Sequence, residues 1–167
     1  IPRIYYFIDD LNENHITKLK KNVAIIYRNY SQKADINKII KFNKICKKNK
    51  RLFFISNNIK LAIKLDLNGA YIPAFNNKIN LSHYKKKNFL FLGSAHSIKE
   101  IIIKEKQGVD CIFISPLFLT SKSNKFLGIT NSKKLSNHTN KKVIALGGLN
   151  KKNLHKIKVL NVHGYAS

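Results

Sequence analysis

The chain has 167 residues, of which 44% are hydrophobic, so it is long enough and apolar enough for one globular domain, and a disordered chain is excluded. Lysine and arginine number 32 against 8 acidic residues, a formal net charge of +24. No apolar run approaches the about 20 residues of a membrane-spanning helix, and the opening IPRIYYFIDD lacks the layout of a signal peptide. We therefore expect a globular protein that does not enter a membrane.

The positive charge allows two interpretations, a nucleic-acid binder or a general drift of composition toward lysine. Lysine is spread over nearly every predicted helix and loop, and it far outnumbers arginine, which base readout favours. We therefore predict no dedicated nucleic-acid binding, although such a field attracts phosphorylated small molecules. Cys46 and Cys111 lie far apart in apolar patterns, which is typical of reduced core residues of a cytoplasmic protein.

Short apolar runs rich in β-branched and aromatic residues recur along the chain and predict strands. Eight such runs occur, at residues 4–8, 23–27, 52–55, 69–72, 89–92, 111–114, 143–146 and 162–166. Each run is continuously apolar and does not alternate with polar residues. This pattern indicates strands covered on both faces, as in a parallel sheet inside a layer of helices.

Helical spacing separates most of these runs. In residues 34–48, isoleucines recur at steps of three and four with lysines opposite. In residues 96–108, Ser97 is a predicted N-cap, Glu100 completes a capping box and Gly108 ends the helix. A shorter helix is predicted in NIKLAIKLDLNG, closing at Gly69.

This alternation predicts an α/β fold, a TIM (β/α)8 barrel in one domain over residues 1–167. The barrel must be compact, because the connection near residues 76–88 leaves room for only a minimal fourth helix and no final helix follows the last strand. A doubly wound sheet is the alternative, but no glycine-rich turn follows the first strand.

In a barrel of this kind, chemistry belongs at the carboxyl ends of the strands. Polar residues follow the apolar runs at these ends, which is the pattern of a polar mouth on an apolar barrel. They include Asp9, Asp10, Arg28, Tyr30, Ser56, Asn57, Asn76, Ser94, His96, Lys122, Gly147, Gly148 and Asn150.

Three late segments, FLGSAHSIKE, IFISPLFLTSK and VIALGGLNKKN, resemble the signatures of the thiamine-phosphate synthase and thiazole tautomerase family. The earlier segments IPRIYYFIDD, AIIYRNY and NNIKLAIKLDLNGAYIP fall in the right order and spacing for the same family. The resemblance covers essentially the whole chain. It implies a TIM barrel that couples a pyrimidine methyl pyrophosphate to a thiazole phosphate with the help of Mg²⁺.

The resemblance assigns catalytic and phosphate-binding roles to residues at the mouth. Arg28 matches an arginine that offers a bidentate fork to phosphate, although Tyr30 stands where the family has a lysine. Ser94 and His96 match a motif in which serine bonds to pyrophosphate and histidine donates to a phosphate or moves protons. Arg28 and His96 also have structural alternatives, which are a surface salt bridge for Arg28 and packing or helix capping for His96.

The phosphate of the thiazole substrate has its own predicted residues. Thr120 matches a family threonine, and Lys122 lies beside Ser123, where the family has a lysine. Gly147 and Gly148 let the backbone approach a phosphate, and the N–H groups that open the next helix point at it. The alternative for the two glycines is a tight turn with no ligand. The run 121–128 is predicted to form a flap over the mouth.

The predicted metal site differs from the pattern of the family. Asn57 and Asn76 stand where the family has aspartates, and an asparagine offers Mg²⁺ one carbonyl oxygen without charge. The resemblance thus implies Mg²⁺ with weakened ligands, and loop asparagines in turns are the alternative.

Three functions remain open from the sequence. The first is a synthase that makes thiamine phosphate and pyrophosphate from phosphorylated pyrimidine and thiazole molecules. The second is a thiazole-phosphate tautomerase that uses His96 and needs no metal, and the third is a non-catalytic binder of phosphate ligands. A homo-oligomer is left open.

Overall fold

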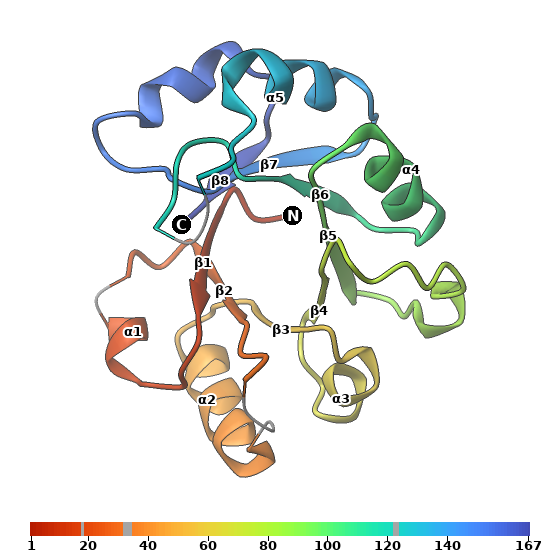
Figure 1. The fold of residues 1–167 in the computed structure, drawn as a ribbon. Helices are drawn as coiled ribbons and strands as arrows, with labels where there is room; N and C mark the ends of the chain where they lie inside the picture. Colours follow the sequence, from red (N-terminus) through yellow and green to blue (C-terminus); the bar gives the residue numbers. More distant parts are fainter. Residues whose placement is uncertain (18, 32–34, 122–123) are drawn as a thin grey trace.

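Eight parallel strands form a closed barrel in the computed structural model, which describes residues 1–17, 19–31, 35–121 and 124–167 (Figure 1). The strands are β1 (Ile4–Ile8), β2 (Val23–Tyr27), β3 (Phe53–Ser56), β4 (Gly69–Ile72), β5 (Leu90–Ala95), β6 (Cys111–Ile114), β7 (Lys142–Leu146) and β8 (Gly164–Ala166). The eight predicted strands are all present, and their ends differ from the prediction by at most three residues.

Each strand pairs in parallel with the next, and β1 pairs with β8, so the sheet has no edge. The register at the closure places Ile4 beside Tyr165 and Tyr5 beside Ala166. An open, doubly wound sheet would leave two edge strands unpaired. The closure confirms the predicted barrel and rules out that alternative.

Two apolar layers explain why the strands are continuously apolar. One layer fills the barrel, where side chains from non-adjacent strands meet: Tyr5 packs edge-on against Phe113, with ring centroids 4.9 Å apart, and Phe7 packs against Tyr71 at 5.2 Å. The other layer lies between the sheet and the helices and includes Ile25 and Ile112. Residues that alternate along a strand therefore face two different cores.

Helices surround the barrel, as Figure 1 shows. They are α1 (Asn14–Thr17), α2 (Ile36–Lys48), α3 (Ile59–Lys64), η1 (Ser82–Tyr84), α4 (Ile98–Lys106), α5 (Gly128–Asn137) and η2 (Leu154–Val159). The minimal fourth helix is the short 3-10 segment η1. The prediction that the third helix closes at Gly69 was wrong, because α3 ends at Lys64 and Gly69 begins β4.

The helix after β5 begins as predicted, with one change in the capping box. The Ser97 side chain accepts a hydrogen bond from the N–H of Glu100 at 3.3 Å. The Glu100 carboxylate accepts from the N–H of His96 at 2.6 Å, one residue before the N-cap. Glu100 therefore fixes the backbone of His96 at the barrel mouth.

Both cysteines, Cys46 and Cys111, are buried and form no disulfide. Burial raises the pKa of each thiol to about 12. Within the described parts of the chain, no helix has the length and apolar character that crossing a bilayer requires.

Candidate functional site

Three predicted catalytic residues line one cavity of about 320 Å³ at the carboxyl ends of the strands. Arg28 follows β2, Ser94 belongs to the end of β5, and His96 follows β5 directly. Tyr30 and Phe75 also line this mouth cavity. The structure therefore brings together residues that lie up to 68 positions apart in the sequence.

Arg28 is held at the rim of the mouth cavity by its backbone and by an aromatic ring. Its N–H donates to the carbonyl of Ile8 at 2.8 Å. Its guanidinium carbon lies 4.6 Å from the centre of the Phe7 ring, within the range of a cation–π interaction. Stacking on a ring leaves the edge of the guanidinium for hydrogen bonds, which is the geometry that recognises phosphate.

Ser94 lies deeper in the mouth cavity than Arg28 and is only 3% exposed. Tyr71, on the neighbouring strand β4, lines the same cavity, and its phenol interacts with the Ser94 side chain. Burial raises the pKa of Tyr71 to about 12, so its phenol stays protonated at neutral pH. Tyr71 and Ser94 thus both present neutral hydroxyl groups in the cavity wall.

One of the two ring nitrogens of His96 already makes a hydrogen bond. Its Nδ1 is hydrogen-bonded to the backbone carbonyl of Ser115, which can only accept, so Nδ1 carries the proton. The Ser115 hydroxyl lies 3.3 Å from the same nitrogen. Nε2 is therefore the nitrogen of the neutral ring that accepts a proton. The sequence analysis placed Ser115 at a strand end, within the segment IFISPLFLTSK, but assigned it no role.

His96 and Ser115 also line a second cavity of about 450 Å³, on the side of β6. Its other lining residues are Pro116, Lys125, Phe126 and Leu127. This apolar cavity adjoins the mouth cavity through the two shared residues. The site therefore has two adjacent chambers with His96 between them.

Gly147 and Gly148 pack against the loop that follows β6. Both have positive φ, at 97° and 68°. A Cβ on Gly147 would lie 2.9 Å from Pro116, and one on Gly148 would lie 2.4 Å from the carbonyl oxygen of Leu119. Close packing and backbone conformation thus require glycine here whether or not a phosphate binds, and the phosphate role stays a prediction.

The helix predicted after these glycines is not an α-helix. The segment that follows is a turn, and the 3-10 segment η2 begins only at Leu154. The N–H of Asn150 is bonded at 2.8 Å to the side chain of Asn153. The helix type was therefore predicted wrongly, because local asparagine bonds form a turn here and a 3-10 segment follows. The approach of backbone N–H groups to a phosphate at this turn stays a prediction.

Thr120 is half-buried and borders neither of the two cavities as the described residues define them. Lys122 and Ser123, which the resemblance places at the phosphate, lie outside the described residues. The same gap interrupts the predicted flap 121–128, of which Phe126 and Leu127 line the apolar cavity. The roles of Thr120 and Lys122 stay predictions.

Asn57 and Asn76 meet each other outside the mouth cavity. The Asn76 amide nitrogen donates to the side-chain oxygen of Asn57 at 2.8 Å, and the Asn76 side-chain oxygen accepts from the N–H of Lys78 at 3.1 Å. Both oxygens are therefore engaged and neither carries a charge. Among the described residues, no group of three or more histidine, cysteine, aspartate or glutamate side chains has the arrangement of a metal site. This donor set does not fit Mg²⁺, which prefers carboxylates.

Comparison with known proteins identifies the family. The model for "Thiamine monophosphate synthase" matches residues 11–167. The chain belongs to the thiamine monophosphate synthase family. The resemblance drawn from the sequence motifs is thereby confirmed.

Individual relatives agree with this family. A protein of Aquifex aeolicus, provisionally named thiamine-phosphate synthase 2, is 29% identical over 98% of this chain and 92% of its own length. The thiamine-phosphate synthase of Prochlorococcus marinus subsp. pastoris is 29% identical over 92% of this chain, which spans 46% of that relative. A solved structure, thiamine phosphate pyrophosphorylase from Pyrococcus furiosus, has the same fold, with a TM-score of 0.76 at 20% identity over 99% of this chain and 84% of that one.

One buried lysine near the mouth of this family member was missed from the sequence. Lys104 of α4 is fully buried, and its ammonium donates to the carbonyls of Pro73 and Asn76, at 2.8 and 2.9 Å, and to the side chain of Gln107 at 2.9 Å. Lys104 lies three residues after Ile101, on the buried face of the helix. That spacing was the signal available in the sequence.

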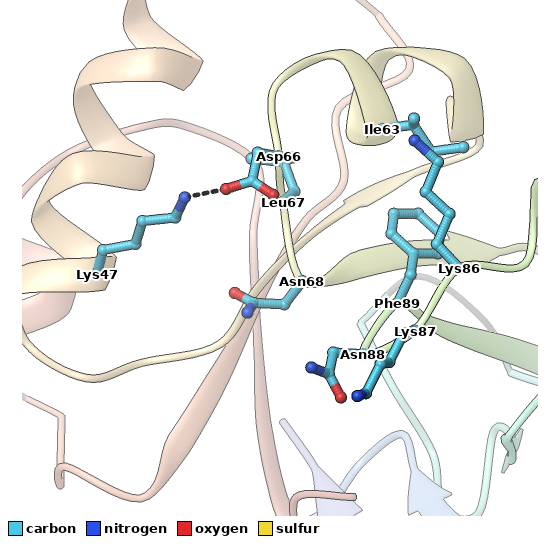
Figure 2. Close-up of a pocket in the computed structure, with 9 residues that line it drawn as sticks. All are labelled: Lys47, Ile63, Asp66, Leu67, Asn68, Lys86, Lys87, Asn88 and Phe89. Carbon is cyan, nitrogen blue, oxygen red and sulfur yellow. Dashed lines mark hydrogen bonds and ion pairs between the residues drawn. The ribbon is translucent and has the colours of Figure 1, made fainter.

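A further pocket of about 300 Å³ lies at the opposite end of the barrel, near the residues that precede β4 and β5 (Figure 2). Its walls include Lys86, Lys87 and the exposed ion pair of Lys47 with Asp66. The hydrogen bond from Lys47 lowers the pKa of the Asp66 carboxyl. None of the predicted site residues that the structure describes lines this pocket. It lies away from the strand ends where chemistry is expected in this fold.

Proposed function

We propose that the chain is a thiamine-phosphate synthase, which couples hydroxymethylpyrimidine pyrophosphate to thiazole phosphate and forms thiamine phosphate and pyrophosphate. Family membership supports an enzyme of thiamine biosynthesis. The observation that carries the proposal is the pair of adjoining chambers that share His96 and Ser115. A reaction that joins two ring molecules needs two neighbouring sites that open toward each other.

The residues of the mouth cavity supply what a leaving pyrophosphate needs. The Arg28 guanidinium gives a fixed positive charge and paired N–H donors. Ser94 offers a hydroxyl deeper in the cavity, beside the neutral Tyr71. His96 places Nε2 at the boundary between the chambers, where it can exchange a proton with the oxygens of the leaving pyrophosphate.

The tautomerase and the non-catalytic binder are not favoured by the comparisons, since the relatives described above carry synthase names. We also propose that the chain acts in the cytoplasm. Two buried cysteines without a disulfide support that location, because reduced thiols are typical of it.

The test is a coupling assay with the purified chain, both phosphorylated substrates and MgCl₂, followed by chromatography of thiamine phosphate. We expect product with the wild-type chain. The doubly substituted Asn57→Asp, Asn76→Asp chain should be more active at a given Mg²⁺ concentration, because two carboxylates supply the charged oxygens that the asparagine pair lacks. No product from the wild-type chain at high enzyme concentration would contradict the proposal.

A further inference from the structure

Two large aromatic side chains stand exposed on one wall of the mouth cavity. Tyr30 follows β2 and is 54% exposed, and Phe75 follows β4 and is 64% exposed. Their rings meet edge to face, with centroids 5.7 Å apart and planes at 74°. An exposed aromatic pair at a cavity is the composition of a binding surface, because solvent exposure of such rings is otherwise unfavourable.

Both rings are held in place before any ligand arrives. The Tyr30 hydroxyl is hydrogen-bonded to the Ser56 hydroxyl at 2.7 Å. The loop that carries Phe75 is tied to α4 because the Lys104 ammonium binds the carbonyls of Pro73 and Asn76 on either side of it. A surface fixed in this way binds a flat ligand with little ordering cost.

The charged residues beside Tyr30 and Phe75 indicate which kind of ligand binds there. Tyr30 stands where the family resemblance implies a lysine, so a cation has been replaced by a ring at this position. Arg28 remains two residues away in sequence and lines the same cavity. The Glu100 carboxylate also lines the cavity, and it already accepts from the N–H of His96. Among the described residues, the wall therefore offers aromatic surface beside the fixed positive charge of Arg28, which suits a planar ring that carries a phosphate group.

We propose that Tyr30 and Phe75 form an aromatic platform that binds the heteroaromatic ring of the phosphorylated pyrimidine substrate, with its phosphate toward Arg28. The identity of the ring rests on the proposed function. The apolar cavity is the place for the thiazole, because Pro116 in its wall packs against Gly147, one of the predicted residues for the thiazole phosphate. The pyrimidine then occupies the mouth cavity. Ring binding at the platform replaces part of the electrostatic binding that a lysine and a metal would provide.

Calorimetry with the pyrimidine monophosphate, which has no pyrophosphate to lose, measures ring binding without turnover. We expect Tyr30→Ala and Phe75→Ala each to weaken its binding by about tenfold, the scale of removing one aromatic ring from a stacked base. Tyr30→Phe keeps the ring and loses only the bond to Ser56, so its loss should be smaller. Binding of inorganic phosphate, which has no ring, should be unchanged in all three variants because Arg28 is intact.

Thermal unfolding of each variant checks that the fold is retained, and Tyr30→Phe serves as the matched control where an alanine variant is unstable. The platform is wrong if the alanine variants bind the pyrimidine monophosphate like the wild type, if they lose both probes equally, or if the wild-type chain does not bind this probe. The alanine variants could lose affinity for the pyrimidine monophosphate alone while the wild-type chain forms no thiamine phosphate. That result would refute the synthase activity and support the platform.

Discussion

At the scale of single residues, the hydrogen bond of His96 to Ser115 determines which of its ring nitrogens can take part in a reaction. Because the Ser115 carbonyl holds Nδ1–H, only Nε2 is left for chemistry, and the two nitrogens can be tested separately. An asparagine amide nitrogen lies near the place of Nδ1, whereas a glutamine amide nitrogen reaches the place of Nε2. The pair of substitutions therefore distinguishes a positioning role from a role in proton transfer.

We expect His96→Asn to keep the bond to Ser115 and the stability of the chain, but to lower the rate of thiamine phosphate formation by about 100-fold, within the range for a lost acid or base. Substrate affinity should change little. His96→Gln is the control that tests the Ser115 bond, and it should lower the melting temperature more than His96→Asn does. A His96→Asn chain with the full rate would show that Nε2 takes no part in the reaction.

The asparagine pair shows what residue-level sequence reasoning could not reach. The positions of Asn57 and Asn76 after β3 and β4 were predictable, because each follows an apolar run. Their mutual hydrogen bond was not, since it depends on the positive φ of Asn57 and on the approach of two loops. The sequence pattern is the same whether the two asparagines bind a metal separately or are hydrogen-bonded to each other.

At the scale of elements, the strands were predictable because eight apolar runs each had to be buried on both sides. The buried face of α4 was harder to predict, because lysine is a residue type that is mostly exposed. Lys104 instead points inward, and Gly93 leaves room for it, since a Cβ on Gly93 would lie 2.9 Å from the Lys104 side chain. The residue type suggested exposure, whereas the helical spacing indicated burial.

This buried lysine leads to a prediction for the link between α4 and the β4 loop. Lys104→Met keeps the length of the side chain but leaves the Pro73 carbonyl and the side-chain oxygen of Gln107 without their donor, whereas the Asn76 carbonyl keeps the bond from the Gln107 amide. We expect the free energy of unfolding to fall by about 2 kcal/mol, since each unsatisfied buried polar group costs about 1–3 kcal/mol. Urea denaturation measures the change. Lys106→Met, on the exposed side of the same helix, is the matched control and should change stability by less than about 0.5 kcal/mol.

At the scale of the whole molecule, barrel closure was predictable from the number and order of the strands. The site was predictable only as a ring of residues after strand ends. Which of them share a cavity depends on the loops: Arg28, Ser94 and His96 meet, whereas Asn57 and Asn76 lie in a neighbouring cavity. The glycines after β7 were also ambiguous, because a phosphate and a packed loop both require a residue without a side chain.

As pH rises, a buried lysine raises the free energy of unfolding of the chain, whereas two buried thiols lower it. Burial lowers the pKa of Lys104 from 10.5 to about 8, so above pH 8 the folded chain releases a proton that the unfolded chain keeps. The unfolded state then binds more protons, and stability rises with pH until about 10.5. The thiols of Cys46 and Cys111, with pKa values raised from 9.0 to about 12, have the opposite effect, because the unfolded chain loses their protons first. Their contribution to stability is present below pH 9 and is lost above it.

We therefore expect the free energy of unfolding to pass through a shallow maximum near pH 9 under reducing conditions. Lys104 alone should add about 1 kcal/mol between pH 8 and 9, as its shift implies. Urea denaturation across pH 7.5–10.5 measures the profile for the wild-type chain and for Lys104→Met, and the difference between the two isolates the lysine from the thiols and phenols. That difference should grow in favour of the wild type as pH rises from 8. A constant difference across this range would mean that the lysine carries the same charge in the folded and unfolded chains, and that its burial does not displace its proton.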